Sequence, residues 1–316
     1  MPLSTSVSEK SIRAARLDLF TIALIGTIAV MLAGLEIVSR AKFDSTSKVQ
    51  RLEVAQRAVL LAVRDASETR NPHLAMLGNS LMVEGVDLPQ FQTALNPRYV
   101  PTPYFVLGTN YYDWFFGLRR LFAEGTRPEY VLVGLSPNEL ASSGVRGDIT
   151  ARYMVQQSDL LKIVRLTHMD ATRASEFIMS HYSEFYSTRE ITRGYVMSRV
   201  LPSVGGMFHT QYAAVRDEEL KGSVLRMAAE NRLSALDELC RSNGAHLIFV
   251  VPPTYQNGAA VIQEVGREHG IPVLVPVKDG EFDSTYYQED GIHMNRKGAA
   301  IFTTRLAESL NEQLPK

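Results

Sequence analysis

The segment HLAMLGNS, residues 73–80, is a short apolar run that ends in a glycine and two polar residues. Its length and composition predict a buried strand over His73–Gly78, followed by a helix or by a loop with a helix at Leu88–Ala94. A serine at such a strand-to-helix turn exposes its hydroxyl at the carboxyl edge of a sheet, where open α/β folds place their sites. Ser80 is therefore a candidate nucleophile. The alternative, and the commoner role of a serine after a strand, is to cap the helix.

Four further apolar runs predict strands, and helical patterns separate them. Strands alternating with helices indicate a parallel sheet covered on both faces, that is, a three-layer α/β/α domain with a five-stranded parallel sheet. The aromatic residues of segment 112–116 are expected in its core rather than on a sugar-binding surface. The strands are expected at Val100–Gly108, Glu129–Leu135, His246–Val251 and Ile271–Val277, and the helices at Tyr112–Glu124, Asp217–Asn243, Ala259–His269 and Asn295–Leu314.

Residues 141–215 interrupt this alternation. Strand signals are few there, and helical segments alternate with glycine and serine. An insertion of roughly 70 residues is too long for a plain loop, so we expect a lid, a partner surface or a small helical subdomain. Its histidines, His168, His181 and His209, lack the spacing of metal ligands. We expect neither a metal ion nor a cofactor.

The N-terminal region predicts a membrane anchor. Leu19–Leu35 carries no charge, and its length of about 17 residues is near the lower limit for crossing a bilayer. Basic residues before the run favour a cytoplasmic N-terminus and a domain on the extracytoplasmic (periplasmic) side of a bacterial cytoplasmic membrane. The alternative is a cleaved signal peptide, because Ser39-Arg40-Ala41 has small residues at suitable positions. The expected segments are a leader over 1–16, an anchor over 17–39, a linker helix over 40–70 and the domain over 71–316.

A second polar cluster lies near the C-terminus, where Asp290-Gly291-Ile292-His293 precedes the last expected helix. Histidine is suited to act as a general base, and an acid three residues earlier can hold its ring in the required tautomer. A plain turn beside a helix start is the alternative interpretation. Together with Ser80, the pair predicts a serine-dependent hydrolase site.

Three turns at expected strand ends precede this pair in order: Gly78-Asn79-Ser80, Gly108-Thr109-Asn110 and Ser136-Pro137-Asn138. The ordered set resembles the SGNH (GDSL-like) hydrolase superfamily over about residues 73–312. The resemblance implies the flavodoxin-like SGNH fold, with Ser80 as nucleophile, His293 as base and Asp290 as the acid that orients it. It also implies an oxyanion hole made by the N–H groups of Ser80 and Gly108 and the side-chain amide of Asn138, with Asn110 as the alternative amide donor.

The sequence departs from the family pattern in two blocks. The first block has Gly-Asn-Ser where the family usually has Gly-Asp-Ser, and that acid is not the one that orients the histidine. In the third block three residues separate Gly134 from Asn138, where the family has one.

A membrane-anchored SGNH-like domain resembles the accessory proteins of extracytoplasmic polysaccharide modification, such as teichoic-acid D-alanylation and alginate or cellulose acetylation. This implies transfer of an acyl (acetyl-like) group to or from a cell-envelope glycan through an acyl-enzyme on Ser80, with a membrane-bound O-acyltransferase as possible partner. The alternatives are a non-catalytic glycan-binding or scaffold protein and a simple envelope esterase. The net charge of −1 gives no basic field for nucleic acid, and the single cysteine, Cys240, is expected in the core.

Overall fold

The computed structural model describes residues 8–46, 48–63, 71–200 and 221–315. Its sheet has five parallel strands in the order β2-β1-β3-β4-β5. This is the strand order of flavodoxin-like folds, so the predicted α/β class with a five-stranded parallel sheet is confirmed. The strands are β1 (His73–Gly78), β2 (Val100–Phe105), β3 (Tyr130–Gly134), β4 (His246–Val250) and β5 (Val273–Leu274).

Four of these strands are shorter than the sequence predicted. The largest difference is in β5, which has two residues in place of the expected Ile271–Val277. Pro272 and Pro276 lie on either side of it, and proline has no N–H to donate to a ladder. The apolar run therefore continues beyond the part that pairs with β4.

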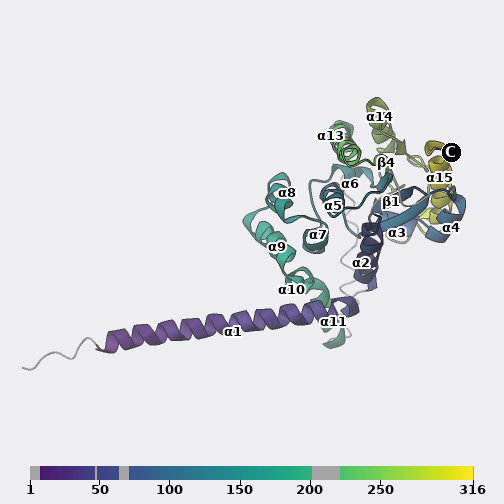
Figure 1. The fold of residues 1–316 in the computed structure, drawn as a ribbon. Coiled ribbons are helices and arrows are strands. Elements are labelled where there is room, and N and C mark those ends of the chain that lie inside the picture. Colours follow the sequence, from purple (N-terminus) through teal and green to yellow (C-terminus); the bar gives the residue numbers. More distant parts are fainter. Residues whose placement is uncertain (1–7, 47, 64–70, 201–220, 316) are drawn as a thin grey trace, which may run out of the picture.

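Helices cover both faces of the sheet (Figure 1). Side chains of β1 divide between the faces as the two-residue period of a strand requires: Leu74 and Met76 join one core, and Ala75 and Leu77 join the other. The first core is closed by α3 (Ser80–Gly85), α4 (Leu88–Ala94) and α15 (Arg296–Gln313), and the second by α5 (Tyr111–Ala123), α6 (Pro137–Ala141), α13 (Gly222–Arg241) and α14 (Ala259–His269).

The helices of the sequence analysis lie within a few residues of these bounds. The predicted Asp217–Asn243 helix begins at Gly222 in the described part of the chain, and its residues 217–220 lie outside that part. Trp114 and Phe116 of α5 are fully buried, so the aromatic segment belongs to the core as predicted.

The N-terminal apolar run lies in one long helix, α1 (Ser8–Thr46), which is followed by α2 (Lys48–Leu61). Its apolar segment Asp18–Lys42 has 25 residues; the most apolar 18-residue stretch within it has a mean hydropathy of 2.2 and is not buried by the rest of the protein. By length and composition this segment suits a membrane anchor or a signal sequence. Within the expected linker segment 40–70, α1 runs on to Thr46 and α2 covers Lys48–Leu61, and residues 64–70 lie outside the described residues.

The second helix, α2, covers the open side of the edge strand β2. Pro101 and Pro103, which have no N–H, fit such an edge. At the end of β2 the N–H of Phe105 donates to Gln56 Oε1 (2.9 Å). Just after the strand the N–H of Leu107 donates to Glu53 Oε1 (3.1 Å). Side chains of α2 thus satisfy backbone donors that no sixth strand pairs.

Residues 148–200 form a helical unit beside α5 (Figure 1). Its core joins Phe116 of α5 to Phe177, Ile163 and other apolar side chains of the insertion. The segment is therefore a packed helical subdomain, and residues 201–215 of the expected insertion lie outside the described residues. Its helices are α7 (Asp148–Tyr153), a 3-10 turn at Gln157–Asp159, α8 (Leu160–Leu166), α9 (Ala171–Tyr182), α10 (Glu184–Ser187) and α11 (Arg189–Val200).

Candidate active site

Ser80 is the first residue of α3, directly after the carboxyl end of β1. The cap of this helix is Asn79, whose Oδ1 accepts the N–H of Leu81 (3.0 Å) and whose Nδ2 donates to the carbonyl of Thr109 (3.0 Å). The capping role considered for Ser80 is thus filled by its neighbour. The hydroxyl of Ser80 is left to interact with another group.

The glycines of the first and third blocks have a packing role. Gly78 and Gly134 lie opposite each other in β1 and β3. A Cβ atom on either one would overlap the side chain of Met82, which is fully buried. Their bare backbones let Met82 pack across the strand ends, which fixes the first turn of α3 and with it Ser80.

His293 connects Ser80 to Asp290. Its Nε2 lies 2.8 Å from Ser80 Oγ, and its Nδ1 lies 2.6 Å from Asp290 Oδ2. An ionised Asp290 accepts the Nδ1 proton, which leaves Nε2 to accept the hydroxyl proton of Ser80. The structure therefore brings the three predicted residues into one hydrogen-bonded chain, although Ser80 and His293 are 213 positions apart.

The carboxylate of Asp290 is kept ionised by its hydrogen bonds. Burial acts to raise its pKa, but the bonds from the His293 side chain and from the N–H groups of Ile292 (2.8 Å) and His293 (3.0 Å) outweigh burial and lower the pKa below 3.8. The side chains of His293 and Asp290 are 26% and 34% exposed. The pair is thus ordered by its bonds while solvent still reaches it.

The loop 288–293, which holds this pair, is fixed at both ends. An antiparallel bridge joins Tyr287 to Met294, just outside the loop. Gly291 has φ +69°, a conformation that favours glycine. Asn295 then caps α15 by accepting N–H groups of its first turn. The histidine is therefore set by a short turn between a bridge and a capped helix.

Gly108 and Asn138, the other predicted members of the oxyanion hole, follow β2 and β3. These strands flank β1, so all three blocks meet at the carboxyl edge of the sheet. Gly108 has φ +69°, and Asn138 lies half-buried in the first turn of α6. The alternative donor, Asn110, caps α5 with its side chain. The role of these three residues in binding an oxyanion stays a prediction.

Two charged side chains that the sequence analysis did not single out hold the turn at Leu107. Glu53 of α2 accepts its N–H, and Nη1 of Arg146 donates to its carbonyl (2.5 Å). The two side chains are themselves 3.5 Å apart. No local sequence signal marks either residue, because Glu53 of α2 and Arg146 of the segment before α7 are both far from Leu107 in the sequence. We call this turn, residues 107–110, the Gly108 turn.

Asp113 fixes the other end of the Gly108 turn. Its carboxylate accepts the N–H of Asn110 (2.8 Å) and the N–H of Arg146 (3.1 Å). Burial raises the pKa of Asp113 to about 7, although these bonds and the Arg146 charge act in the opposite direction. The Asn110–Asp113 spacing is that of a capping box, the one local signal that could have revealed this residue.

A further acid, Glu139, lies close to the histidine. Its Oε2 accepts the N–H of Ser136 (2.8 Å), and its side chain also bonds to Asn79 and is attracted by His293. Burial raises the pKa of Glu139 above its usual 4.5. The structure thus links Glu139 to the caps of α3 and α6.

A hollow of about 710 Å³ lies on the side of α3 that faces the start of α15. It lies between α3 and the residues that follow His293. Its polar lining includes Glu84, Asp87, Gln288 and Arg296. None of Ser80, Asp290 and His293 lines this hollow.

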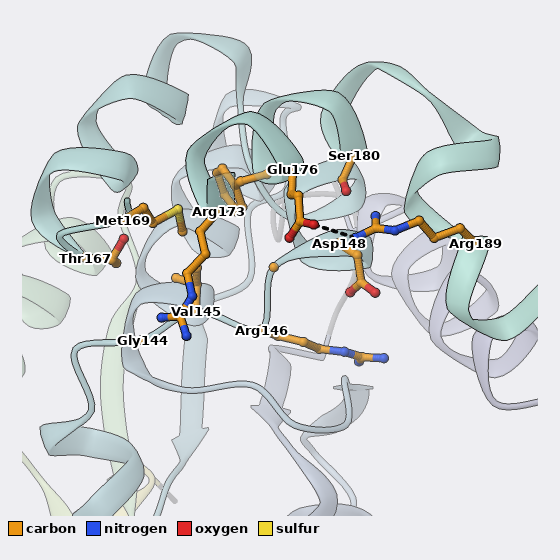
Figure 2. A pocket seen from close by; sticks show the side chains of 12 residues that line it. Gly144, Val145, Arg146, Asp148, Thr167, Met169, Arg173, Glu176, Ser180 and Arg189 are labelled. Atoms are coloured by element: carbon orange, nitrogen blue, oxygen red, sulfur yellow. Dashed lines mark ion pairs between the residues drawn. The ribbon is translucent and has the colours of Figure 1, made fainter. Parts of the chain in front are cut away.

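A second hollow, of about 290 Å³, lies in the insertion, and none of Ser80, Asp290 and His293 lines it. Figure 2 shows side chains of α9 over segment 144–148, with Glu176 directed toward Arg189. These two side chains form an ion pair at 3.6 Å. This hollow does not reach those three residues, but it is lined by Arg146, whose side chain holds the turn at Leu107.

Among the described residues no group of His, Cys, Asp and Glu side chains is arranged to hold a metal ion. His209 of the insertion lies outside those residues. Burial raises the pKa of Cys240 to about 12, which agrees with the core position predicted for it.

No protein-family model matches the chain, and no curated protein matches its sequence. A solved structure titled "Crystal Structure of TesA" has a TM-score of 0.40 at 12% identity, covering 77% of this chain and 99% of that chain. A similarity of this size says nothing about activity. The fold rests on the strand order, and the site rests on its own geometry.

Proposed function

We propose that the chain is a membrane-anchored serine esterase or acyltransferase of the SGNH type, which carries an acyl group on Ser80. The observation that supports this most is the hydrogen-bonded chain of Ser80, His293 and Asp290, with bonds of 2.8 and 2.6 Å. An isolated serine is a weak nucleophile at neutral pH, and a histidine base oriented by a carboxylate is the arrangement that activates it.

The reaction has two halves. In the first, Ser80 Oγ attacks the acyl carbonyl carbon while His293 Nε2 takes the hydroxyl proton. The bond to the leaving alcohol then breaks, His293 returns the proton to that alcohol, and an ester remains on Ser80. In the second half His293 takes a proton from the acceptor hydroxyl, whose oxygen attacks the ester carbon. The bond from that carbon to Ser80 Oγ then breaks, and His293 returns the proton to Ser80 Oγ. Water as acceptor gives hydrolysis, and a sugar hydroxyl gives transfer.

Each half builds negative charge on the carbonyl oxygen. Donors fixed toward that oxygen each contribute about 10²–10³-fold in rate. The N–H groups of Ser80 and Gly108 and the amide of Asn138 are the proposed donors. Their support is the meeting of three blocks at one sheet edge and the rigid Gly108 turn.

The proposed acceptor or substrate is a cell-envelope polysaccharide, and the acyl group is acetyl-like. The resemblance of the sequence blocks supports this class. A membrane-bound O-acyltransferase is the proposed partner that supplies the acyl group.

The proposed location is the outer side of the cytoplasmic membrane, with α1 as a single-pass anchor. The apolar segment Asp18–Lys42 supports the anchor. Lys10, Arg13 and Arg16 before it support a cytoplasmic N-terminus.

The test uses the full chain in detergent with p-nitrophenyl acetate as donor and cellotetraose as acceptor. Intact-mass analysis after a brief reaction is expected to show one acetyl group on Ser80, absent from Ser80→Ala. Acetylated cellotetraose would establish transfer, and acetate alone would establish an esterase. A folded protein with no adduct on Ser80 would overturn the acyl-enzyme and favour the scaffold alternative.

A further inference from the structure

The insertion contacts the long N-terminal helix at a defined level. Glu36 is the first charged residue after the uncharged run Leu19–Leu35. Its carboxylate accepts the hydroxyl of Ser183 (2.8 Å) and the N–H groups of Glu184 (2.9 Å) and Phe185 (3.1 Å). These donors form the start of α10, so Glu36 binds that end of the insertion. Figure 1 shows α10 and α11 beside the C-terminal part of α1.

Glu36 also marks where a spanning α1 leaves the hydrocarbon. It pairs with Arg40 at 2.8 Å, and charged side chains are costly in the hydrocarbon core but tolerated among headgroups. With Glu36 at headgroup level, the start of α10 is at the same level. The insertion is then held against the membrane surface rather than away from it.

Helices α8 and α9 lie over α1 on the N-terminal side of α10 (Figure 1). Large apolar side chains of both helices are exposed. Tyr182 directly precedes Ser183, whose hydroxyl donates to Glu36. On α8, exposed basic residues accompany the apolar ones. The exposed set, called here the α8–α9 face, consists of Leu161 (60% exposed), Lys162, Arg165, Leu166 (39%), Met179 (50%) and Tyr182 (51%).

We propose that the α8–α9 face lies in the headgroup region of the phospholipid membrane that α1 crosses. Leucine, methionine and tyrosine side chains insert at the boundary of the acyl chains, and Lys162 and Arg165 contact anionic headgroups. Tyrosine is enriched at that depth because its ring is apolar and its hydroxyl is polar. This inference rests on the anchoring part of the proposed function and is independent of the Ser80 chemistry.

The acidic groups near the face do not oppose this placement. Asp170 caps α9 by accepting the N–H of Arg173 (2.8 Å). Glu176 pairs with Arg189. Both carboxylates are therefore engaged within the insertion, while the outward charges of α8 are basic.

The test uses the full chain in vesicles of equal parts phosphatidylcholine and phosphatidylglycerol that contain a nitroxide-labelled lipid. Single cysteines carrying an NBD fluorophore are placed on the face (Leu166→Cys, Tyr182→Cys), in α1 (Val30→Cys) and, as a matched exposed control, at Tyr255→Cys. Cys240 is fully buried, so the introduced thiol is the one that reacts. Tyr255 lies in the loop after β4 and is 40% exposed.

We expect lipid quenching at positions 166 and 182 at least about twofold stronger than at 255, since an inserted face lies near the nitroxide. Equal quenching at all three positions, with strong quenching at Val30→Cys, would overturn the proposal while leaving the anchor intact. Absence of quenching at Val30→Cys as well would show that the anchor itself fails.

Two further variants separate the parts of the proposal. Lys162→Gln combined with Arg165→Gln is expected to reduce quenching at position 182 in these vesicles, and unchanged quenching would overturn the electrostatic part. Glu36→Ala is expected to lower quenching at position 182 but not at position 30, because it removes the bond between α10 and α1. Unchanged quenching at both positions would overturn the role of Glu36.

Discussion

The two halves of the candidate site are built differently. On one side Ser80, His293 and Asp290 come from two short turns, and each turn is ordered by local caps and bonds. On the other side the Gly108 turn is held by charges from distant elements: Glu53 of α2 and Arg146 of the segment leading into the insertion. The first half lies partly open to solvent, and the second contains buried carboxylates.

This difference implies different sensitivities. The hydrogen-bonded chain of the first half needs three side chains and little else, so its loss acts on the chemical step directly. The Gly108 turn depends on α2, which follows the N-terminal apolar helix, and on the segment that leads into the insertion. Changes in those parts are therefore expected to affect the rate through the geometry of this turn.

The largest expected effect is that of Ser80→Ala. Removal of the nucleophile is expected to lower kcat/KM for p-nitrophenyl acetate by at least about 10⁴-fold. Ser309→Ala is the matched control, because Ser309 is a half-buried serine that bonds only to the carbonyl of Arg305. A Ser80→Ala enzyme that retains a tenth of the activity would show that another group is the nucleophile.

Asp290→Asn comes next. The amide keeps the size of the side chain but no longer stabilises a protonated histidine ring, and a loss of about 10³-fold in kcat is expected. Asp283→Asn serves as control, since Asp283 also caps a turn of this region by accepting the N–H of Thr285 (2.8 Å). Equal activities of the two variants would contradict the role given to Asp290.

Arg146→Gln tests the second half of the site. Loss of the bond to the Leu107 carbonyl lets the Gly108 turn shift, and a small shift of an oxyanion donor is expected to lower kcat by about 10-fold with little change in KM. Arg152→Gln is the matched control: the Arg152 side chain is similarly buried (19% exposed, against 23% for Arg146) but bonds to Glu184 inside the insertion. Similar kcat values for both variants would mean that Arg146 acts on stability alone.

The smallest effect concerns pH and stability. Burial raises the pKa of Asp113 in the folded protein to about 7, from the value of 3.8 that is usual for an exposed aspartate. Between these values the folded state holds a proton that the unfolded state releases, so the unfolding free energy contributed by this group falls as pH rises from about 4 to 7. Asp113→Asn is expected to flatten that slope in urea unfolding at several pH values. An unchanged slope would show that Asp113 is ionised in the fold.

The residues of the first half of the site and the alternation of strands and helices were accessible from the sequence, because both depend on local patterns, whereas the flavodoxin-like fold was implied only by the family resemblance. An apolar run, a glycine and a serine mark the end of β1, and an acid three residues before a histidine marks the late turn. Glu53 and Arg146 were missed because their partners are backbone groups near Leu107, far from both in the chain. The strand ends were misjudged for a related reason. An apolar run shows which residues are buried, but it does not show where backbone pairing ends. Pairing ends where a proline has no N–H to donate, or where a side chain accepts the N–H in place of a neighbouring strand.

The measurement that tests the central claim most directly is labelling of the full chain in detergent with a fluorophosphonate, with the adduct located by mass spectrometry. An adduct on Ser80 that disappears in His293→Ala, with the fold of that variant intact by circular dichroism, is the expected result. A folded wild-type protein that forms no adduct on Ser80, or one that labels equally without His293, would contradict the account of an activated serine.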